Sequence, residues 1–485
     1  MNYLPKNLNH LMDSPEFKNL LRDKFPFDAT QSQEHWLESI VSFLFTKEKQ
    51  VLYLLKGYAG TGKSTLIGHL VRYLIHANFK SVLMAPTGRA AKVIAGYSNK
   101  KAFTIHKQIY YTKAEQGSGV KFVLKPNKFK NTLFIVDEAS MIGDDRQSAK
   151  LFENGSLLDD LMQYVDAGLN CKLLLVGDPA QLPPVHLNIS PALDADYLER
   201  QFNKQITESE LKEVVRQSQD SGILTNATQL RTQMETDYLD SYSFDLSVGT
   251  DVLRLQDGNE ILELLDDALR NDGLEDTVFI VRSNKRANLY NQQIRSRILF
   301  LEAELSVGDQ LMVVKNNYFW LEPESDPGFI ANGDLIKVLR IISHHDLYNF
   351  KFATVEVQLV DYPEEKPFET VLLLDTLTSE SPSLTYEEGN ELYQAVQEDY
   401  IHLTSKYKRF RAVKNNPYFN ALQVKYSYAI TCHKSQGGQW KNVFIEQPYL
   451  PEGTDLSYFR WLYTAITRAQ SNLYLVGFKN DFFVN

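Results

Sequence analysis

The sequence has 485 residues, enough for two to four domains that each bury a core. Its hydrophobic content of 43% and charged content of 23% are ordinary for a globular protein, and its net charge of −10 argues against a nucleic-acid partner unless the basic residues are clustered. The two cysteines, Cys171 and Cys432, are far apart and form no Cys-x-x-Cys, which excludes a zinc ribbon, a cysteine-ligated iron–sulfur cluster and a disulfide framework.

The composition also bears on where the protein works. No apolar run approaches the length that spans a membrane, and the N-terminal segment lacks the apolar core of a signal peptide. With so few cysteines, these features predict a soluble protein of the reducing cytoplasm that has no membrane partner.

The basic residues are in fact clustered in two blocks. Ten lysines and arginines and one carboxylate lie between Arg89 and Lys130, and six basic residues and no carboxylate lie between Thr404 and Lys425. Aromatic residues are interleaved in both blocks, as in grooves that bind single-stranded nucleic acid. The alternative is that both blocks are solvated surface, but the pattern favours a nucleic-acid track.

Residues 30–45 are predicted to form an amphipathic helix with Thr30 as its N-cap. Gln33 is either an ordinary polar residue of the first turn or a residue that reads the adenine edge of a nucleotide. The second interpretation depends on the phosphate-binding motif that follows about thirty residues later.

That motif begins after a predicted buried strand, Val51–Leu55, and is followed by apolar residues at helical spacing from Leu66 to Leu74. The intervening sequence GYAGTGKS satisfies G-x-x-x-x-G-K-[ST], in which glycines let backbone N–H groups surround a phosphate chain at a helix N-terminus. Lys63 is expected to reach the β- and γ-phosphates, and Ser64 to bind Mg²⁺. The predicted nucleotide contacts are Gly57, Gly60, Thr61, Gly62, Lys63, Ser64 and Thr65.

A second predicted strand, residues 81–84, runs into Ala-Pro-Thr-Gly-Arg. This turn is either an ordinary loop or a place where Pro86, Thr87 and Arg89 hold a backbone phosphate. His106 follows, as a nucleic-acid contact or as a capped surface histidine, and residues 107–131 are predicted to leave the sheet as a hairpin.

The third strand, residues 132–136, is followed by Asp137 and Glu138. Beside a phosphate loop, the aspartate is expected to hold Mg²⁺ and the glutamate to deprotonate the attacking water, whereas in isolation the pair would be two acids at a helix start. A fourth strand, residues 172–176, leads to Gln181, which is placed to contact the γ-phosphate or its water. Arg216 is predicted to be a phosphate-facing cation.

The second half alternates strands and helices again. Residues 277–282 and 424–431 are predicted strands, a helix covers residues 284–298, and the last helix and strand cover residues 458–469 and 472–477. Between them, residues 305–375 contain several short strand-like pieces and residues 386–408 a polar helical piece. The chain is therefore predicted to contain two α/β units, each with an insert.

Taken in order, the segments GYAGTGKST, APTGRAAKVI, TIH, VDEASM, VGDPAQLPPV, LKEVVRQ, TCHKSQGGQW and LYTAITRAQ resemble the motif set of the superfamily 1B helicases, RecD-like branch, from Gln33 to Arg468. The resemblance implies an α/β protein with two RecA-like parallel-sheet motor domains. The first, at 1–245, would carry a small pin-bearing insert at about 107–131. The second, at 246–304 and 421–485, would carry an SH3-like β insert at 305–420.

The resemblance also implies an enzyme, an ATP-dependent 5′→3′ DNA helicase. Such a protein hydrolyses ATP with Mg²⁺ at an interdomain cleft, moves along single-stranded DNA and unwinds tailed duplex as a monomeric motor. Partners from DNA repair or recombination would fit, although the sequence names no pathway. Two alternatives stay open: an ATP-driven nucleic-acid clamp or remodeller without processive unwinding, and an RNA-directed helicase.

The resemblance assigns further roles by position. Gln33 would read adenine, Asp137 would hold Mg²⁺, Glu138 would be the base and Gln181 the γ-phosphate sensor. Arg216 and Arg468 would be arginine fingers, and Gly438 would contact the nucleotide. The implied DNA contacts are Pro86, Thr87, Arg89, His106, Thr431, Cys432, His433 and Lys434. One departure is Gln439, which stands where the family commonly has a glutamate.

Overall fold

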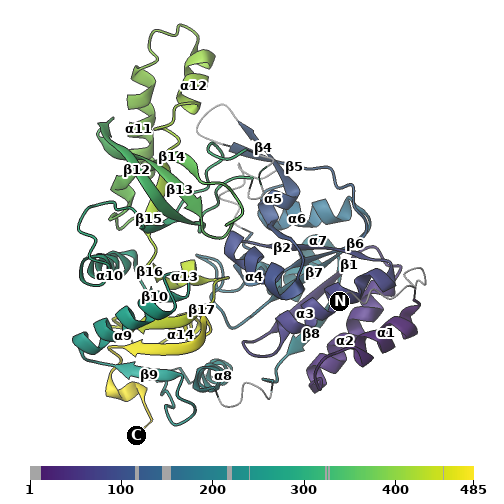
Figure 1. The fold of residues 1–485 in the computed structure, drawn as a ribbon. Coiled ribbons are helices and arrows are strands. Elements are labelled where there is room, and N and C mark those ends of the chain that lie inside the picture. Colours follow the sequence, from purple (N-terminus) through teal and green to yellow (C-terminus); the bar gives the residue numbers. More distant parts are fainter. Residues whose placement is uncertain are drawn as a thin grey trace, which may run out of the picture. The chain divides into compact units, whose positions relative to one another are not determined.

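The computed structural model describes residues 12–114, 120–144, 154–215, 221–236, 238–239, 241–322, 325, 328–451 and 453–484. It consists of two compact units whose main division falls between Asp220 and Ser221. This division lies ahead of the predicted boundary at 245/246, because the helix Gly222–Met234 groups with the second unit. Figure 1 shows the first unit in purple to blue and the second in teal to yellow.

The first unit is built on a six-stranded sheet with the order β3-β2-β6-β7-β1-β8, and every neighbouring pair is parallel. Its strands are mostly apolar on both faces, as parallel strands covered by helices are. The strands are β1 (Val51–Gly57), β2 (Lys80–Ala85), β3 (Ala102–Thr104), β6 (Lys130–Val136), β7 (Leu169–Gly177) and β8 (Gln205–Leu211). A separate antiparallel hairpin consists of β4 (Tyr110–Ala114) and β5 (Val120–Leu124), within the region predicted to be the pin insert.

Several helices of the first unit begin at residues whose side chains accept a hydrogen bond from a free N–H group of the first turn. Thr30 caps one of them: its hydroxyl accepts from the Gln33 amide, and the Gln33 side chain accepts from the Thr30 amide at 3.1 Å, which is a capping box. The helices are α1 (Ser14–Asp23), α2 (Gln31–Phe45), α3 (Lys63–Tyr73), α4 (Gly88–Ser98), α5 (Ile105–Ile109), α6 (Leu157–Asp166) and α7 (Ala195–Phe202), with 3₁₀ turns η1 (Leu74–Ala77), η2 (Ala139–Met141) and η4 (Pro191–Leu193).

The second unit contains a five-stranded parallel sheet with the order β16-β10-β17-β18-β9. Its strands are β9 (Val252–Leu255), β10 (Thr277–Val281), β16 (Ala429–Thr431), β17 (Trp440–Glu446) and β18 (Ala469–Val476). The associated helices are α8 (Gly222–Met234), α9 (Gly258–Asn271), α10 (Asn284–Arg297), α13 (Cys432–Ser435) and α14 (Leu456–Ile466), with the 3₁₀ turn η7 (Asn480–Phe482). Each unit therefore has its own parallel sheet, and the predicted α/β class is confirmed.

The insert of the second unit is a closed barrel of five strands. Its strands are β11 (Gln310–Val313), β12 (Leu335–Leu347), β13 (Phe350–Leu359), β14 (Phe368–Leu373) and β15 (Leu422–Tyr426), with the 3₁₀ turn η6 (Leu374–Thr376). A small barrel agrees with the SH3-like insert that the resemblance implied. The predicted strand 424–431 was wrong in one respect, because its first part closes the barrel as β15 and its last part joins the parallel sheet as β16.

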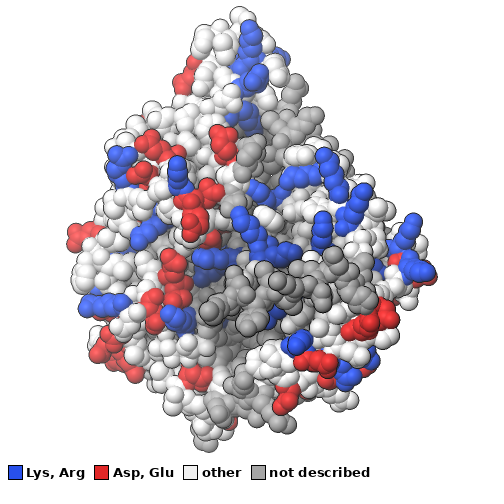
Figure 2. Space-filling model, turned by 45° about the vertical axis from the view of Figure 1, so that its right-hand side comes forward, with Lys and Arg blue, Asp and Glu red and all other residues white. Residues whose placement is uncertain are grey.

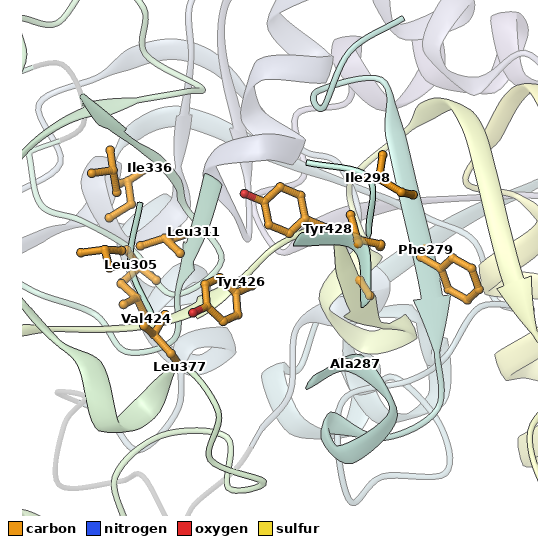
Figure 3. Close-up of a cluster of buried hydrophobic side chains, with 14 of the residues drawn as sticks. Phe279, Ala287, Ile298, Leu305, Leu311, Ile336, Leu377, Val424, Tyr426 and Tyr428 are labelled. Carbon is orange, nitrogen blue, oxygen red and sulfur yellow. The ribbon is translucent and has the colours of Figure 1, made fainter. Parts of the chain in front are cut away.

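One continuous core links this barrel to the sheet beside it. Figure 3 shows Tyr426 and Tyr428 with barrel side chains on one side and side chains of the sheet and α10 on the other. A buried ion pair reinforces the junction: Arg295 donates to both carboxylate oxygens of Asp309 at 2.9 Å, and the Tyr428 hydroxyl donates to the same carboxylate at 2.9 Å. The barrel and the sheet are thus joined by shared packing as well as by the chain.

Two further helices, α11 (Tyr386–Glu398) and α12 (Lys406–Lys414), form a hairpin inserted between β14 and β15 and project beyond the barrel (Figure 1). Where the sequence predicted one helical piece at 386–408, the structure has two helices. Their inner faces pack on the barrel through a cluster that includes Leu392, Val396 and Val413. Among the helices that the structure describes, none has both the length and the apolar character needed to cross a membrane.

Candidate nucleotide and nucleic-acid sites

The phosphate loop lies in the first unit, where β1 runs into α3. Gly60 and Gly62 have φ angles of 74° and 83°, in the left-handed region that favours glycine. Gly62 also has no room for a side chain, because a Cβ there would lie 2.7 Å from Nε2 of Gln33. Two of the glycines predicted from the motif are therefore required by the backbone itself.

Lys63 is the first residue of α3, at the helix end whose free N–H groups attract anions. Its ammonium donates to the carbonyl of Gly57 at 2.5 Å and to that of Tyr58 at 2.9 Å. The Thr61 hydroxyl donates to the Tyr58 carbonyl at 2.8 Å and so closes the same turn. Lys63 thus lies over the loop, held by carbonyl groups that a phosphate oxygen can replace as its partner.

Gln33 is buried beside this loop. Its Nε2 donates to the Thr61 carbonyl at 2.9 Å, while its Oε1 accepts from Thr30. Both ends of the amide are therefore engaged, and the side chain ties the start of α2 to the phosphate loop. A contact to adenine, as the sequence predicted, would require this amide to exchange its partners.

The carboxylates after β6 lie next to the loop in the parallel sheet. The Asp137 carboxylate accepts from the amide of Glu138 at 2.9 Å and from the hydroxyl of Tyr97. Burial, reinforced by the negative charge of Glu138, raises the pKa of Asp137 to about 6. Glu138 has a φ of 53°, an uncommon conformation for a non-glycine residue of the kind that clusters at functional sites.

Tyr97 is a site residue that the sequence did not indicate. It lies near the end of α4, its hydroxyl donates to Asp137, and the side chain of Ser64 lies close to it. Burial, with the nearby charge of Asp137, raises the pKa of Tyr97 well above its ordinary value, so the hydroxyl stays protonated and donates. Only the tertiary fold brings α4 to this place, and no local pattern around Tyr97 marks it.

The donor set fits a magnesium ion. Ser64 and Asp137 offer oxygen atoms, the ligands that Mg²⁺ prefers, and the Tyr97 hydroxyl donates to Asp137 with Ser64 close by. Within the described residues, no group of three or more His, Cys, Asp or Glu side chains could hold a metal. Mg²⁺ usually takes only one or two protein ligands together with phosphate and water.

Gln181 follows β7, whose neighbours in the sheet are β6 and β1. Its side chain is buried, and its Oε1 has no hydrogen-bond partner among the described residues. A buried acceptor without a donor is costly, and such atoms in native proteins call for an explanation. An acceptor of this kind suits a water molecule or a protonated ligand group, which agrees with the predicted role beside the γ-phosphate.

In the second unit, Arg468 precedes β18 and is held by groups of its own unit. Its guanidinium donates to the Thr464 carbonyl at 3.0 Å and to the Gly438 carbonyl at 3.2 Å. The structure therefore brings together two predicted nucleotide contacts, Gly438 and Arg468. The other predicted arginine finger, Arg216, lies outside the described residues.

The predicted DNA contacts Pro86, Thr87, Arg89 and His106 lie after β2 and after β3. Pro86 and Thr87 form the bend after β2, and Arg89 lies in the first turn of α4. His106 packs against the rings of Tyr110 and Phe122, whose centroids lie 5.8 and 5.1 Å away. Burial lowers the pKa of His106 to about 4, so at neutral pH this ring can offer a hydrogen bond but no charge.

The predicted contacts of the second unit lie where β16 enters α13. Cys432 is buried and its thiol donates to the Trp461 carbonyl, whereas His433 is exposed. The ammonium of Lys434 is buried with no hydrogen-bond partner among the described residues. Burial, with the charge of Lys425, lowers its pKa to about 8. Cys432 is therefore a packing residue rather than a contact, while Lys434 lacks the anionic partner it needs.

Comparisons with known proteins agree with this arrangement. The family model described as "AAA domain" matches residues 30–245, which hold the phosphate loop and the carboxylates. The model described as "UvrD-like helicase C-terminal domain" matches residues 426–476, which hold Lys434, Gly438 and Arg468. The two matches thus fall on the two parallel sheets.

Individual proteins are similar to this chain as well. The ATP-dependent DNA helicase dda of Enterobacteria phage T4 is 23% identical over 93% of this chain and 99% of its own length. The ATP-dependent RecD2 DNA helicase of Deinococcus radiodurans is 35% identical over 134 residues, 28% of this chain and 16% of that protein. A solved Pif1 helicase is 15% identical with a TM-score of 0.46 over 95% of both chains. The chain is thus similar to a DNA helicase over most of its length, and its two parallel sheets match an AAA domain and a UvrD-like helicase C-terminal domain.

Proposed function

We propose that this protein is an ATP-dependent DNA helicase that moves 5′→3′ along single-stranded DNA and unwinds tailed duplex. The observation that carries the proposal is the phosphate-binding set of the first unit. Lys63 begins α3, directly after the turn in which the glycines have positive φ angles. Asp137 and Glu138 follow β6, which is separated from β1 in the sheet by β7 alone. The phage T4 DNA helicase dda, which matches most of the chain, supports the extension from ATP use to DNA unwinding.

Each residue of the phosphate-binding set in the first unit is proposed to have a separate role in ATP hydrolysis. Lys63 would exchange its carbonyl partners for phosphate oxygens, and Ser64 and Asp137 would hold Mg²⁺. The bound ion would neutralise charge on the phosphates. Glu138 would accept the proton of the attacking water, and the unpartnered Oε1 of Gln181 would accept a hydrogen bond from the same water.

Arg468 and Arg216 are proposed to stabilise charge on the transferred phosphoryl group during turnover. An arginine that acts in this way contributes about 10³- to 10⁵-fold to kcat. Arg468→Ala should therefore lower kcat by at least about 10³-fold while ATP still binds. A loss of ATP affinity without a loss of kcat would remove Arg468 from this role.

DNA is proposed to bind through Pro86, Thr87, Arg89 and His106 of the first half and through Thr431, His433 and Lys434 of the second. The buried ammonium of Lys434 supports this assignment, because a phosphate oxygen would supply the partner that it lacks. A monomeric state and a cytoplasmic location stay predictions, as do partners from DNA repair or recombination.

The direct test uses the purified chain on duplexes with a 5′ or a 3′ single-stranded tail. Single-stranded DNA should stimulate ATP hydrolysis, and only the 5′-tailed duplex should be unwound. Unwinding of the 3′-tailed duplex alone would refute the polarity, and an ATPase rate indifferent to DNA would refute coupling between the two sites.

Two alternatives predict different results. An ATP-driven clamp or remodeller would hydrolyse ATP in response to DNA without displacing a strand. An RNA-directed helicase would be stimulated more by poly-U than by poly-dT, since RNA is distinguished from DNA through the 2′-hydroxyl. The same preparation, assayed for strand displacement and with both polymers, decides between them.

A further inference from the structure

The helix α12 presents positive charge that no carboxylate compensates. Lys406, Lys408 and Arg411 are exposed, and in the part of the chain that the structure describes none of them forms an ion pair. In Figure 2 blue side chains gather at the top of the view, over the hairpin that Figure 1 labels α11 and α12. We call Lys406, Lys408 and Arg411 the α12 cations.

Some other exposed cations of the same unit are paired. Arg270 lies 2.8 Å from Asp266, Arg340 lies 3.6 Å from Glu356 and 3.4 Å from Glu369, and Lys351 lies 3.6 Å from Glu304. These carboxylates offset the charge of their partners locally. The α12 cations, by contrast, are three exposed and unpaired cations on one short helix, in a chain whose net charge is −10.

Three carboxylates in or next to the neighbouring helix have partners other than α12. Glu388 caps the start of α11, Glu391 accepts from Asn349 at 3.3 Å, and Asp399 accepts from the Tyr348 hydroxyl. Asn349 and Tyr348 belong to the turn between β12 and β13. Glu391 and Asp399 therefore bind the barrel and not the α12 cations.

The aromatic residues of this basic block are not arranged for stacking on bases. Tyr418 packs on Phe352 at 5.2 Å, Phe419 packs on Tyr393 at 5.8 Å, and the Lys414 ammonium lies 5.9 Å from the Phe410 ring. Of the aromatic residues in α12, Tyr407 alone is exposed, by 54%. A single-stranded nucleic acid is usually held by bases stacked on several rings, and this surface does not provide them.

We propose that the α12 cations bind the phosphate backbone of duplex DNA, as a site distinct from the single-strand contacts. The inference builds on the proposed function, since a duplex is the substrate that a helicase must hold ahead of its motor. The α12 cations span about 7.5 Å of helix axis at 1.5 Å per residue. Duplex DNA carries one charge about every 1.7 Å, so several phosphates face a segment of this length.

The test is the salt dependence of binding to a blunt duplex that has no single-stranded tail. The variant Lys406→Gln/Lys408→Gln/Arg411→Gln removes the α12 cations and keeps residues that favour helix. Each lost phosphate contact reduces the magnitude of the slope of log K against log salt by about 0.9. The slope of the variant should therefore be smaller in magnitude than that of the wild type by about 2.7. Between about 50 and 200 mM salt, wild-type affinity should fall about 40-fold more than that of the variant.

The matched control is Arg270→Gln/Arg340→Gln/Lys351→Gln, which removes the same charge from exposed positions of the same unit that are already paired. Its duplex affinity and slope should stay near those of the wild type. The three single substitutions in α12, each expected to change the slope by about 0.9, keep the test valid if the triple variant folds poorly.

Stimulation of ATP hydrolysis by single-stranded DNA should be unchanged in the triple α12 variant. If the slope for duplex is unchanged, or if the matched control changes it equally, the proposed site is refuted. If affinity for single-stranded DNA falls as much as affinity for duplex, α12 is part of the single-strand track and the proposal is also refuted. Failure of the proposed function is a separate result: the wild type itself would show no DNA-stimulated ATP hydrolysis.

Discussion

The substitution Gly62→Ala tests the geometry of the phosphate loop most directly. At a φ of 83° an alanine is in the left-handed region, which costs roughly 1–2 kcal/mol for an L-residue. Its Cβ would also lie 2.7 Å from Nε2 of Gln33, so the glutamine must move and lose its hydrogen bond to the Thr61 carbonyl. That bond is worth about 0.5–1.5 kcal/mol.

Together these two costs come to about 1.5–3.5 kcal/mol, all of it in the loop that holds the phosphates. Because the strained loop must return to its wild-type shape to bind ATP, affinity should fall about 12- to 350-fold. The assay is equilibrium titration with a fluorescent ATP analogue. The double variant Gln33→Ala/Gly62→Ala should recover part of the loss, because the close contact is gone while the backbone strain stays.

Gly96→Ala is the control, because it lies within α4 and a Cβ there meets no atom within 4 Å. It should bind ATP normally and gain about 0.5–1 kcal/mol of stability as a helix residue. ATP affinity in Gly62→Ala equal to that of Gly96→Ala would refute the reasoning. If the double variant Gln33→Ala/Gly62→Ala loses more ATP affinity than the two single substitutions lose when added together, the role given to Gln33 is refuted.

Three further predictions follow from the sites. Glu138→Gln should slow ATP hydrolysis about 10²- to 10⁴-fold and leave ATP and DNA binding intact; retained turnover would contradict its role as the base. Tyr97→Phe should raise the Mg²⁺ concentration for half-maximal hydrolysis about 10- to 100-fold, and an unchanged Mg²⁺ titration would argue against Tyr97 as a support of the metal site. Asp309→Ala should destabilise the second unit by about 3–5 kcal/mol, measured as the midpoint of urea unfolding, because it leaves Arg295 buried without its partner. Arg295→Met/Asp309→Ala should recover most of that loss; a double variant no more stable than Asp309→Ala would show that the pair is not the cause.

The sequence allowed the prediction of those parts of the fold whose signal is local. The strands β1, β2, β6 and β7 are apolar runs bounded by turn residues, and they lie where the pattern placed them. The strand β8, Gln205–Leu211, was missed because its sequence QITESEL, at a sheet edge, is mostly polar and has neither an apolar run nor an alternating pattern. Its place is fixed by parallel pairing with β1, which no local pattern reveals.

The same limit applies to the candidate site: residues marked by a local motif could be predicted, and residues placed only by tertiary packing could not. The glycines, Lys63, Asp137 and Gln181 could be named because motif spacing fixes their order along the chain. Tyr97 could not be named, since it lies forty positions from Asp137 in the sequence and its hydroxyl reaches that carboxylate only after α4 packs on the sheet. The inward packing of Tyr418 and Phe419 was likewise hidden, because interleaved aromatic and basic residues have the same sequence pattern whether the rings face solvent or the barrel.

The two tyrosines between barrel and sheet have a mechanical consequence. Tyr426 ends β15 and Tyr428 directly precedes β16, so the same short stretch of chain is anchored in both structures. A sheet and a barrel that share buried side chains and the Arg295–Asp309 pair cannot swivel independently without opening that core. A rotation of the second sheet should therefore carry the β insert with it as one body, because the two share a core that a relative movement would open.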